Sequence, residues 1–359
     1  MKKFNMFFAA AVLASAFGCE KIDTDPASIV GEGETCTLSV SFAGTGVPTK
    51  LVGQDPANES TIQNVQVFVF RKDQGGVLDA SVSAGFDSPL NYDASSAAYA
   101  GIELGCTAGE REVWAVVNAA ADHTADGSVA DRADLLALTS MLSENTESGL
   151  FMTGSKTATL NAGAASVTLE VRRACAAVVL KSVTNRIESQ EQSENFRVKD
   201  VYLINVPAKV NYGLTERYAD AADWYARMGK ESDSGKSLLI LDKSEPVTLA
   251  YGASDNTEHR FYSYPNGWAP STVSEWSPRA TSLVVEAEYK VGGEWLECYY
   301  PVILHNGASG LESNRLYTVE ITVSRPGSDN PNVPVTFDTL SGTIEVLDWE
   351  TGAEYTETI

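Results

Sequence analysis

Apolar residues alternate with polar ones in a series of short runs, and this period of two constrains the fold more than any other feature. The runs cover residues 37–43, 65–70, 113–117, 167–171 and 178–180, and then 198–206, 237–241, 282–289, 295–304, 316–323 and 342–349. Residues two apart lie on the same face of a strand, so each run predicts a half-buried strand. Clusters of Gly, Asn, Asp and Ser separate the runs, which is typical of β-sandwiches rather than of βαβ units.

Two segments have helical spacing instead. Residues 131–144 place Leu135, Leu138, Met141 and Leu142 on one face of a helix, and residues 216–228 show a weaker pattern of the same kind. The polar segment 182–195 predicts a loop or a bulge. The chain is therefore expected to be mostly β, with one or two short helices.

The chain has 359 residues, which is too many for one common core and suits two domains. We expect two β-sandwiches of the transthyretin-like kind in tandem, at residues 51–178 and 179–334. The boundary between them is expected near residues 175–185.

The N-terminus has the features of an export signal. Lys2 and Lys3 precede an apolar run from Phe4 to Phe17, which ends at Gly18 and Cys19. A membrane-spanning helix needs about 20 apolar residues, and this run is shorter. A small residue before a cysteine is typical of a bacterial lipoprotein signal, with residues 1–18 removed and Cys19 carrying the lipid. An ordinary secretory signal with an unrelated cysteine is the alternative.

Composition argues against several classes of function. The formal net charge of −22 disfavours binding to nucleic acids or to anionic membranes. No catalytic motif occurs, and the three histidines lack the spacing of metal ligands, so we expect no enzyme, no cofactor and no metal site. The remaining cysteines have no CxxC spacing, and both disulfides and buried thiols are compatible with their positions, which are Cys36, Cys106, Cys175 and Cys298.

Several strings, taken in order, resemble a known family. They are VWAVVNAA (113–120), GLFMTG (149–154), SVTLEVRRACAAVVL (166–180), FYSYPN (261–266), YYPVIL (299–304), NRLYTVEITVSRPGSDNP (314–331) and TIEVLDWETG (343–352). Together with the lipoprotein signal they resemble the fimbrillins of Bacteroidetes, the FimA- and Mfa1-like subunits of type V pili. The resemblance spans nearly the whole chain.

The resemblance implies a route of maturation. Fimbrillins are exported as outer-membrane lipoproteins, and a surface protease then cuts after a basic residue that follows the first strand. Here that residue is Lys50, followed by Leu51, and residues 19–50 form a propeptide with a removable strand. Lys50 is the only basic residue between Lys21 and Arg71. A solvated loop lysine is the alternative reading.

The resemblance also implies how subunits join. Loss of the first strand leaves an unpaired sheet edge, and a segment from the next subunit fills it. The expected donor is the tail 335–359, with donor residues Thr343, Ile344, Val346, Trp349, Tyr355 and Ile359. The prolines from Pro326 to Pro334 are the expected hinge. The tail is alternatively the last strand of the second sandwich, and both hold if it leaves that sandwich on assembly.

The function implied is a structural subunit of a cell-surface fimbrium that supports adhesion and biofilm formation. Its expected partners are identical subunits in a head-to-tail filament, accessory tip and anchor subunits, and the maturation protease. Two alternatives remain: a tip or anchor subunit, or a glycan-binding surface lipoprotein. For glycan binding, Trp268 and Trp276 are the candidate platform, and a hydrophobic plug is the other role open to them.

Overall fold

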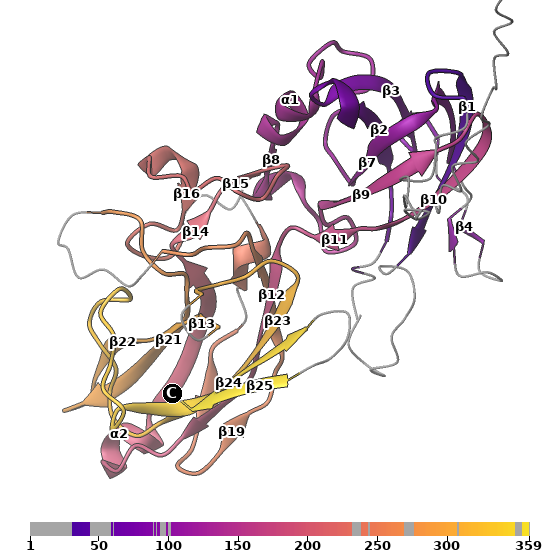
Figure 1. The fold of residues 1–359 in the computed structure, drawn as a ribbon. Helices are drawn as coiled ribbons and strands as arrows, with labels where there is room; N and C mark the ends of the chain where they lie inside the picture. Colours follow the sequence, from indigo (N-terminus) through magenta and orange to yellow (C-terminus); the bar gives the residue numbers. More distant parts are fainter. Residues whose placement is uncertain are drawn as a thin grey trace, which may run out of the picture.

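The computed structural model describes residues 31–43, 59, 61–88, 90, 92–93, 98–99, 102–231, 238–242, 245–268, 276–306, 309–348 and 354–358. Within them most of the chain is in strands, and the α-helices are two short ones, α1 (Arg132–Ala137) and α2 (Gln190–Glu194). Two sandwiches follow one another along the chain (Figure 1). The predicted fold class, two β-sandwiches in tandem, is confirmed.

The first sandwich packs a three-stranded sheet, in the order β10-β1-β6, against a five-stranded sheet, in the order β11-β9-β7-β2-β3. Their bounds are β1 (Thr35–Ala43), β2 (Val65–Arg71), β3 (Val77–Ala84), β6 (Ile102–Thr107), β7 (Gly109–Val117), β9 (Met152–Leu160), β10 (Gly163–Glu170) and β11 (Arg172–Arg173). A 3-10 turn, η1 (Lys72–Gln74), joins β2 to β3, and β4 (Tyr92–Asp93) pairs with β5 (Ala98–Tyr99).

Alternation builds the core between these sheets. In β6, Ile102, Leu104 and Cys106 are buried, while the residues between them are exposed. The same period places Val65, Val67 and Val69 of β2 in this core. Phe68 and Phe70 lie on the other face of β2 and pack beneath the segment that carries α1. Both faces of β2 are therefore buried, which explains why residues 67–70 are all apolar.

The second sandwich consists of two sheets. The six-stranded sheet has the order β19-β12-β23-β24-β25, and β20 also pairs with β12. The other sheet has the order β17-β13-β21-β22, and β18 also pairs with β13. The bounds are β12 (Ala176–Asn185), β13 (Phe196–Ile204), β17 (Leu241–Asp242), β18 (Val247–Leu249), β19 (Ser254–Asp255), β20 (His259–Ser263), β21 (Ser282–Val291), β22 (Glu294–Ile303), β23 (Arg315–Val323), β24 (Leu340–Asp348) and β25 (Glu354–Thr358). The predicted boundary at 178/179 falls inside β12, which lies wholly in this second sandwich.

Short strands join the two sandwiches. Strand β8 (Thr139–Met141) from the first pairs with β15 (Lys209–Asn211) from the second, and both lie between the sandwiches in Figure 1. Beside them, β14 (Val206–Pro207) pairs with β16 (Trp224–Tyr225). One cluster of buried residues runs from Phe68 and Phe151, through Tyr264, into the second core. The two sandwiches thus share a continuous apolar junction.

The helix predicted at 131–144 is mostly wrong. It begins as expected, because the side chain of Asp131 accepts hydrogen bonds from the backbone of Ala133 and Asp134. It ends at Ala137, since Leu138 is extended and the next residues form β8. Leu142–Glu144 form only a 3-10 turn, η2. Pairing with β15 has outweighed the local helical spacing.

Three further local predictions are wrong. Residues 216–228 form no α-helix but a 3-10 turn, η3 (Ala221–Asp223), followed by β16, because Ala226 and Met228 adopt positive φ angles of 49° and 67°. Residues 182–195 form a loop only at 186–189, because residues 182–185 complete β12 and residues 190–194 form α2. The run 237–241 is a 3-10 turn, η4 (Leu238–Ile240), before the two-residue β17.

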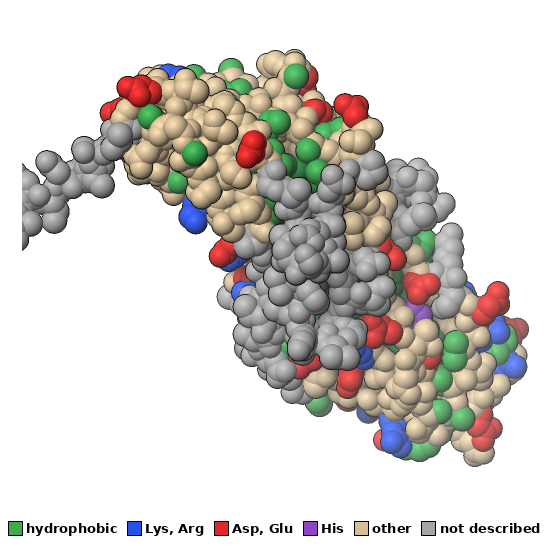
Figure 2. All heavy atoms as spheres, turned by 90° about the vertical axis from the view of Figure 1, so that its right-hand side faces the viewer, with side chains coloured by type: hydrophobic (Ala, Val, Ile, Leu, Met, Phe, Trp, Pro, Cys, Tyr) green, Lys and Arg blue, Asp and Glu red, His purple; other side chains and the backbone are tan. Residues whose placement is uncertain are grey.

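Acidic side chains are scattered over the visible face of both sandwiches, as the net charge leads one to expect (Figure 2). Among the described residues, every helix is too short or too polar to cross a bilayer.

Candidate strand-exchange site

Strand β1 fills the middle of the smaller sheet. It runs parallel to β10 over eight register positions, from Cys36 opposite Gly163 to Ala43 opposite Glu170. On its other side it runs antiparallel to β6 over six positions, from Thr35 opposite Thr107 to Val40 opposite Ile102. We call the space that β1 occupies between β6 and β10 the β1 site. Removal of β1 would leave two strands with unpaired backbone groups facing each other.

One face of β1 is part of the core. Cys36, Leu38 and Val40 are fully buried at 0% exposure, whereas Thr37 is exposed. Their neighbours are Leu104 of β6, Leu169 of β10 and the buried valines of the opposite sheet. The strand therefore contributes side chains to the core between the two sheets, in addition to its backbone pairing with β6 and β10. Without it, the apolar interior of the first sandwich would be open to water.

A buried charge cluster fixes one end of the β1 site. Asp79 of β3 accepts hydrogen bonds from the backbone N–H and the hydroxyl of Thr107, at 2.8 Å each, and pairs with Arg71 and Arg111. The side chains of Asp79 and Arg111 are each 2% exposed. Burial alone raises the pKa of Asp79, but the hydrogen bonds from Thr107 and Arg71 and the charge of Arg71 outweigh it and hold the pKa below its usual value. The end of β6 is thus tied to the five-stranded sheet whether or not β1 is present.

The predicted cleavage residues Lys50 and Leu51 lie outside the described residues, as does the lipidation residue Cys19. Glu59, the next described residue after Ala43, is fully buried. Its carboxylate pairs with Arg260 and accepts a hydrogen bond from the hydroxyl of Tyr262, and Arg173 donates to its carbonyl at 3.3 Å. Arg260 and Tyr262 belong to β20 of the second sandwich, so Glu59 bridges the two domains.

The predicted donor residues are divided between two strands. Thr343, Ile344 and Val346 lie in β24, which pairs with β23 on one side and β25 on the other. Ile344 and Val346 are buried in the second core. Tyr355 lies in β25, while Trp349 and Ile359 lie outside the described residues. Among the described strands, β25 stands at the edge of the sheet and pairs with β24 alone (Figure 1).

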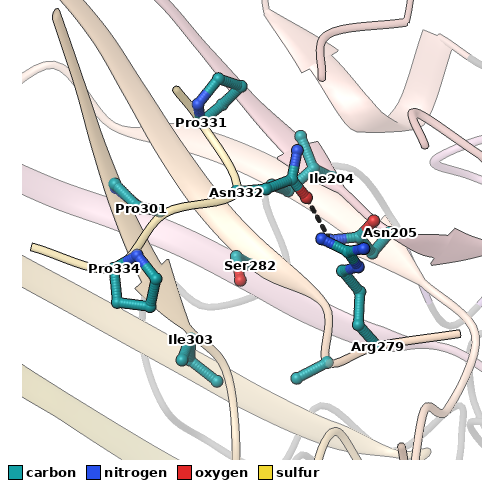
Figure 3. Close-up of a pocket in the computed structure, with 10 residues that line it drawn as sticks. Ile204, Asn205, Arg279, Ser282, Pro301, Ile303, Pro331, Asn332 and Pro334 are labelled. Carbon is teal, nitrogen blue, oxygen red and sulfur yellow. Dashed lines mark hydrogen bonds between the residues drawn. The ribbon is translucent and has the colours of Figure 1, made fainter. Parts of the chain in front are cut away.

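The connection predicted as a hinge is packed against the second sandwich. Ser328 exchanges two backbone hydrogen bonds with Tyr299 of β22, and a side chain at Gly327 would meet the Tyr299 carbonyl oxygen at 2.2 Å. Farther on, Pro331, Asn332 and Pro334 line a small pocket over the ends of β13, β21 and β22, and Asn205 donates to Asn332 at 3.1 Å (Figure 3). The structure therefore holds this connection at several points on its way to β24.

The candidate glycan platform is not exposed. Trp268 and Trp276 are both half-buried, and Trp276 packs on Trp224 with ring centroids 5.9 Å apart. Sequence reasoning also missed β6, one of the two walls of the β1 site, and the site's anchors, whereas the other wall, β10, overlaps the predicted run 167–171. The alternation of Ile102, Leu104 and Cys106 could have revealed β6. No sequence signal marks the contact between Glu59 and Arg260, which are 201 residues apart.

The described residues contain no group of three or more His, Cys, Asp and Glu side chains placed to bind a metal ion. The site offers instead a strand-shaped space with apolar walls and two sets of backbone partners. Such a space can bind an extended segment of protein.

Known proteins share part of this sequence and this fold. Residues 36–196 match the family described as the major fimbrial subunit protein, FimA. No curated protein matches the chain. Three solved structures have the same fold over most of both chains. A putative cell adhesion protein from Bacteroides eggerthii has 22% identity and a TM-score of 0.62, and the match covers 89% of this chain and 97% of that one.

The other two structures are equally extensive matches. A putative cell adhesion protein from Parabacteroides distasonis has 18% identity and a TM-score of 0.64, covering 88% and 100% of the two chains. A fimbrilin (FimA) from Porphyromonas gingivalis has 15% identity and a TM-score of 0.61, covering 90% and 100%. The resemblance to the fimbrillins is therefore confirmed: residues 36–196 match the family of major fimbrial subunit proteins, and the two sandwiches have the fold of a fimbrillin.

Proposed function

We propose that this protein is a shaft subunit of a cell-surface fimbrium, exported as a lipoprotein through Cys19 and polymerised by donor-strand exchange after a cut between Lys50 and Leu51. The match of residues 36–196 to a structural fimbrial family supports a fimbrial subunit involved in adhesion rather than an enzyme. The observation that carries the finer proposal is the central position of β1, whose loss would open one sandwich and leave the other intact.

Strand exchange changes the net free energy little, because the sandwich makes similar contacts with β1 before exchange and with the donor strand after it. A ladder hydrogen bond contributes about 1 kcal/mol net. Each fully buried apolar side chain of β1 adds about 1.5–3 kcal/mol. The cut chain therefore keeps β1 in place until another strand offers comparable contacts. We infer that β1 acts as a placeholder, and that polymerisation replaces it without leaving the core exposed.

The donor is best assigned to the end of the tail. Departure of β24 would expose Ile344 and Val346 and leave β23 without its partner. Departure of β25 would break one ladder, from Thr343 opposite Thr358 to Leu347 opposite Glu354. We therefore propose residues 349–359 as the donor, with β24 retained in the body of the subunit.

This assignment divides the predicted donor residues. Tyr355 and Ile359 are four apart and would share one face of an extended strand, so they can replace the apolar side chains that β1 gives up. Trp349 would lead into the donor. Thr343, Ile344 and Val346 remain structural. The partners are then identical subunits head to tail, with accessory tip and anchor subunits at the filament ends and a maturation protease specific for basic residues.

The test is N-terminal analysis of the protein in filaments sheared from native cells, compared with the protein left in the membrane. We expect filaments to begin at Leu51 and the membrane precursor to begin at a lipid-blocked Cys19. Lys50→Ala should abolish filaments, whereas Lys72→Ala, an exposed lysine paired with Glu110, should leave them unchanged. A lipidated protein that never enters filaments would contradict the proposal and favour an anchor subunit or a glycan-binding lipoprotein.

A further inference from the structure

Two cysteines face each other across the β1 site. Cys36 of β1 and Cys106 of β6 are direct register partners, and both thiols are free and buried. The other described cysteines lie outside the β1 site, Cys175 just before β12 and Cys298 on β22. Cys36 would leave with the removable strand, whereas Cys106 would stay in the subunit.

The hydrogen bonds around the pair define its geometry. The backbone N–H of Ala108 donates to the carbonyl of Glu34 at 2.8 Å, and the N–H of Thr107 donates to Asp79 rather than to β1. Hydrogen-bonded and non-hydrogen-bonded pairs alternate along an antiparallel ladder, so Cys36 and Cys106 form a hydrogen-bonded pair. The Cα atoms of such a pair lie about 5.5 Å apart. That separation is near the most common value for disulfides.

The chemical state of Cys106 agrees with contact between the thiols. Burial and the neighbouring Cys36 raise the pKa of the Cys106 thiol to about 12. A thiol with such a pKa reacts slowly, because the thiolate is the nucleophile. The pair therefore stays reduced once it is buried, and oxidation has to occur while β1 is still pairing with β6 or when that edge opens.

We propose that Cys36 and Cys106 form a reversible disulfide that locks β1 into the β1 site, so that strand exchange requires reduction as well as cleavage. In the oxidation, the two thiols lose two protons and two electrons to a disulfide oxidant, which leaves as two thiols after exchange through a mixed disulfide. Reduction by a dithiol reverses the step. The inference rests on the proposed function, since a lock has a purpose only if β1 is to leave.

The position of the cleavage site allows the disulfide to retain β1 after cleavage. Cys36 lies on the N-terminal side of Lys50, so cleavage alone leaves β1 bound to β6 through the sulfur bridge. Cβ atoms of opposite residues lie about 4.5–5.5 Å apart. A disulfide prefers a Cβ separation of about 3.5–4.5 Å, so the two strands approach each other slightly when the bridge forms. An oxidised subunit is thus exported in a form that cannot polymerise early.

The experiment uses the exported precursor with Cys19→Ser in every sample, so that the four described cysteines are the only ones. One portion is refolded with oxidised glutathione and the other with dithiothreitol, and both are cut by a lysine-specific protease. Peptide mapping without reduction should find Cys36 linked to Cys106 in the oxidised portion alone. The peptide that contains β1 should stay covalently attached there, whereas in the reduced portion at least tenfold more of it should be released as the tails of other subunits replace it.

Variants separate the lock from the proposed function. Cys36→Ser should release β1 and form filaments equally under both conditions, whereas the control Cys175→Ser should behave like the parent. Absence of the linked peptide, or the same redox dependence in Cys36→Ser, would overturn the lock. A third outcome is that the linked peptide forms, but that protein which has been reduced and cut makes no filaments. Strand exchange would then be wrong as the function, and the disulfide would have no role in it, although the disulfide itself would be confirmed.

Discussion

At the scale of single residues, the first sandwich depends on a carboxylate at one end of the β1 site. Asp79 joins β3 to the end of β6 and to two arginines, one of which, Arg111, is itself buried. A buried ion pair contributes little net stability compared with an apolar pair, but loss of one partner leaves the other charge without compensation. Asp79 therefore holds the end of β6 in place against the five-stranded sheet.

We predict that Asp79→Asn lowers the free energy of unfolding by about 3–5 kcal/mol, because Arg111 keeps its charge in a buried position. Urea unfolding of the precursor measures this loss. Asp73→Asn is the matched control. Asp73 also contacts Arg111, at 3.2 Å, but is 37% exposed, and an exposed pair contributes less than about 1 kcal/mol. Equal losses in the two variants would contradict the role given to Asp79.

The pH dependence of the same residue has a definite sign. The pKa of Asp79 is lower in the folded protein than its usual 3.8, so the folded state favours the charged form. The stability it contributes is complete above the unfolded pKa and is lost as the pH falls through the folded pKa. We predict that the unfolding free energy of the parent falls below about pH 4, and that Asp79→Asn shows a shallower fall. Parallel curves for the two proteins would exclude this explanation.

At the scale of elements, β1 should behave as a ligand of its own sandwich. We predict that a synthetic peptide of residues 31–43 binds cut, reduced protein and blocks filament growth. Leu38→Asp in the peptide should weaken binding at least tenfold, because it buries a charge where a leucine is fully buried. Ser39→Asp is the control, since Ser39 lies on the other face of the strand and is half-buried. Light scattering follows filament growth, and equal inhibition by the two variants would contradict the site.

The tail offers a second test at this scale. Deletion of residues 349–359 should leave a folded monomer that cannot extend a filament, with a melting temperature close to that of the parent. Deletion of residues 342–359 should also destabilise the second sandwich, because Ile344, Val346 and Leu347 are buried in its core. Calorimetry and electron microscopy separate the two effects. Normal filaments from the shorter deletion would show that the donor lies elsewhere.

The elements also show how far sequence reasoning reaches. Alternation located the long strands β1, β2, β7, β13, β21, β22 and β23, because their buried faces are set by period two alone. It failed at residues 139–141, where a helical pattern was overridden by pairing with β15. The neighbours of β1 could not be predicted either. The pairing of Cys36 with Cys106 and with Gly163 depends on contacts 70 and more residues away, which no local pattern encodes.

At the scale of the whole molecule, the two sandwiches should unfold together. They share a continuous apolar cluster, the β8–β15 pair and a buried hydrogen bond of 2.8 Å between Ser140 and Tyr264. Glu59 adds the ion pair with Arg260 across the same junction. In the proposed filament this coupling would matter, because tension would enter through the donor strand in one sandwich and leave through the tail of the other.

We predict that Glu59→Gln uncouples this junction. The substitution leaves Arg260 buried without its charged partner, which costs about 3–5 kcal/mol. Calorimetry should then resolve two transitions where the parent shows one. Glu258→Gln is the control, because Glu258 pairs with Lys181 at the surface, where the side chains are 44% and 43% exposed.

Glu59 follows the proposed cut, so its ion pair with Arg260 should survive maturation. Protein cut at Lys50 should therefore still melt in one transition while its β1 site is filled. Two transitions in the unmodified cut protein would show that the junction depends on the propeptide, and that the coupling in the filament has another source.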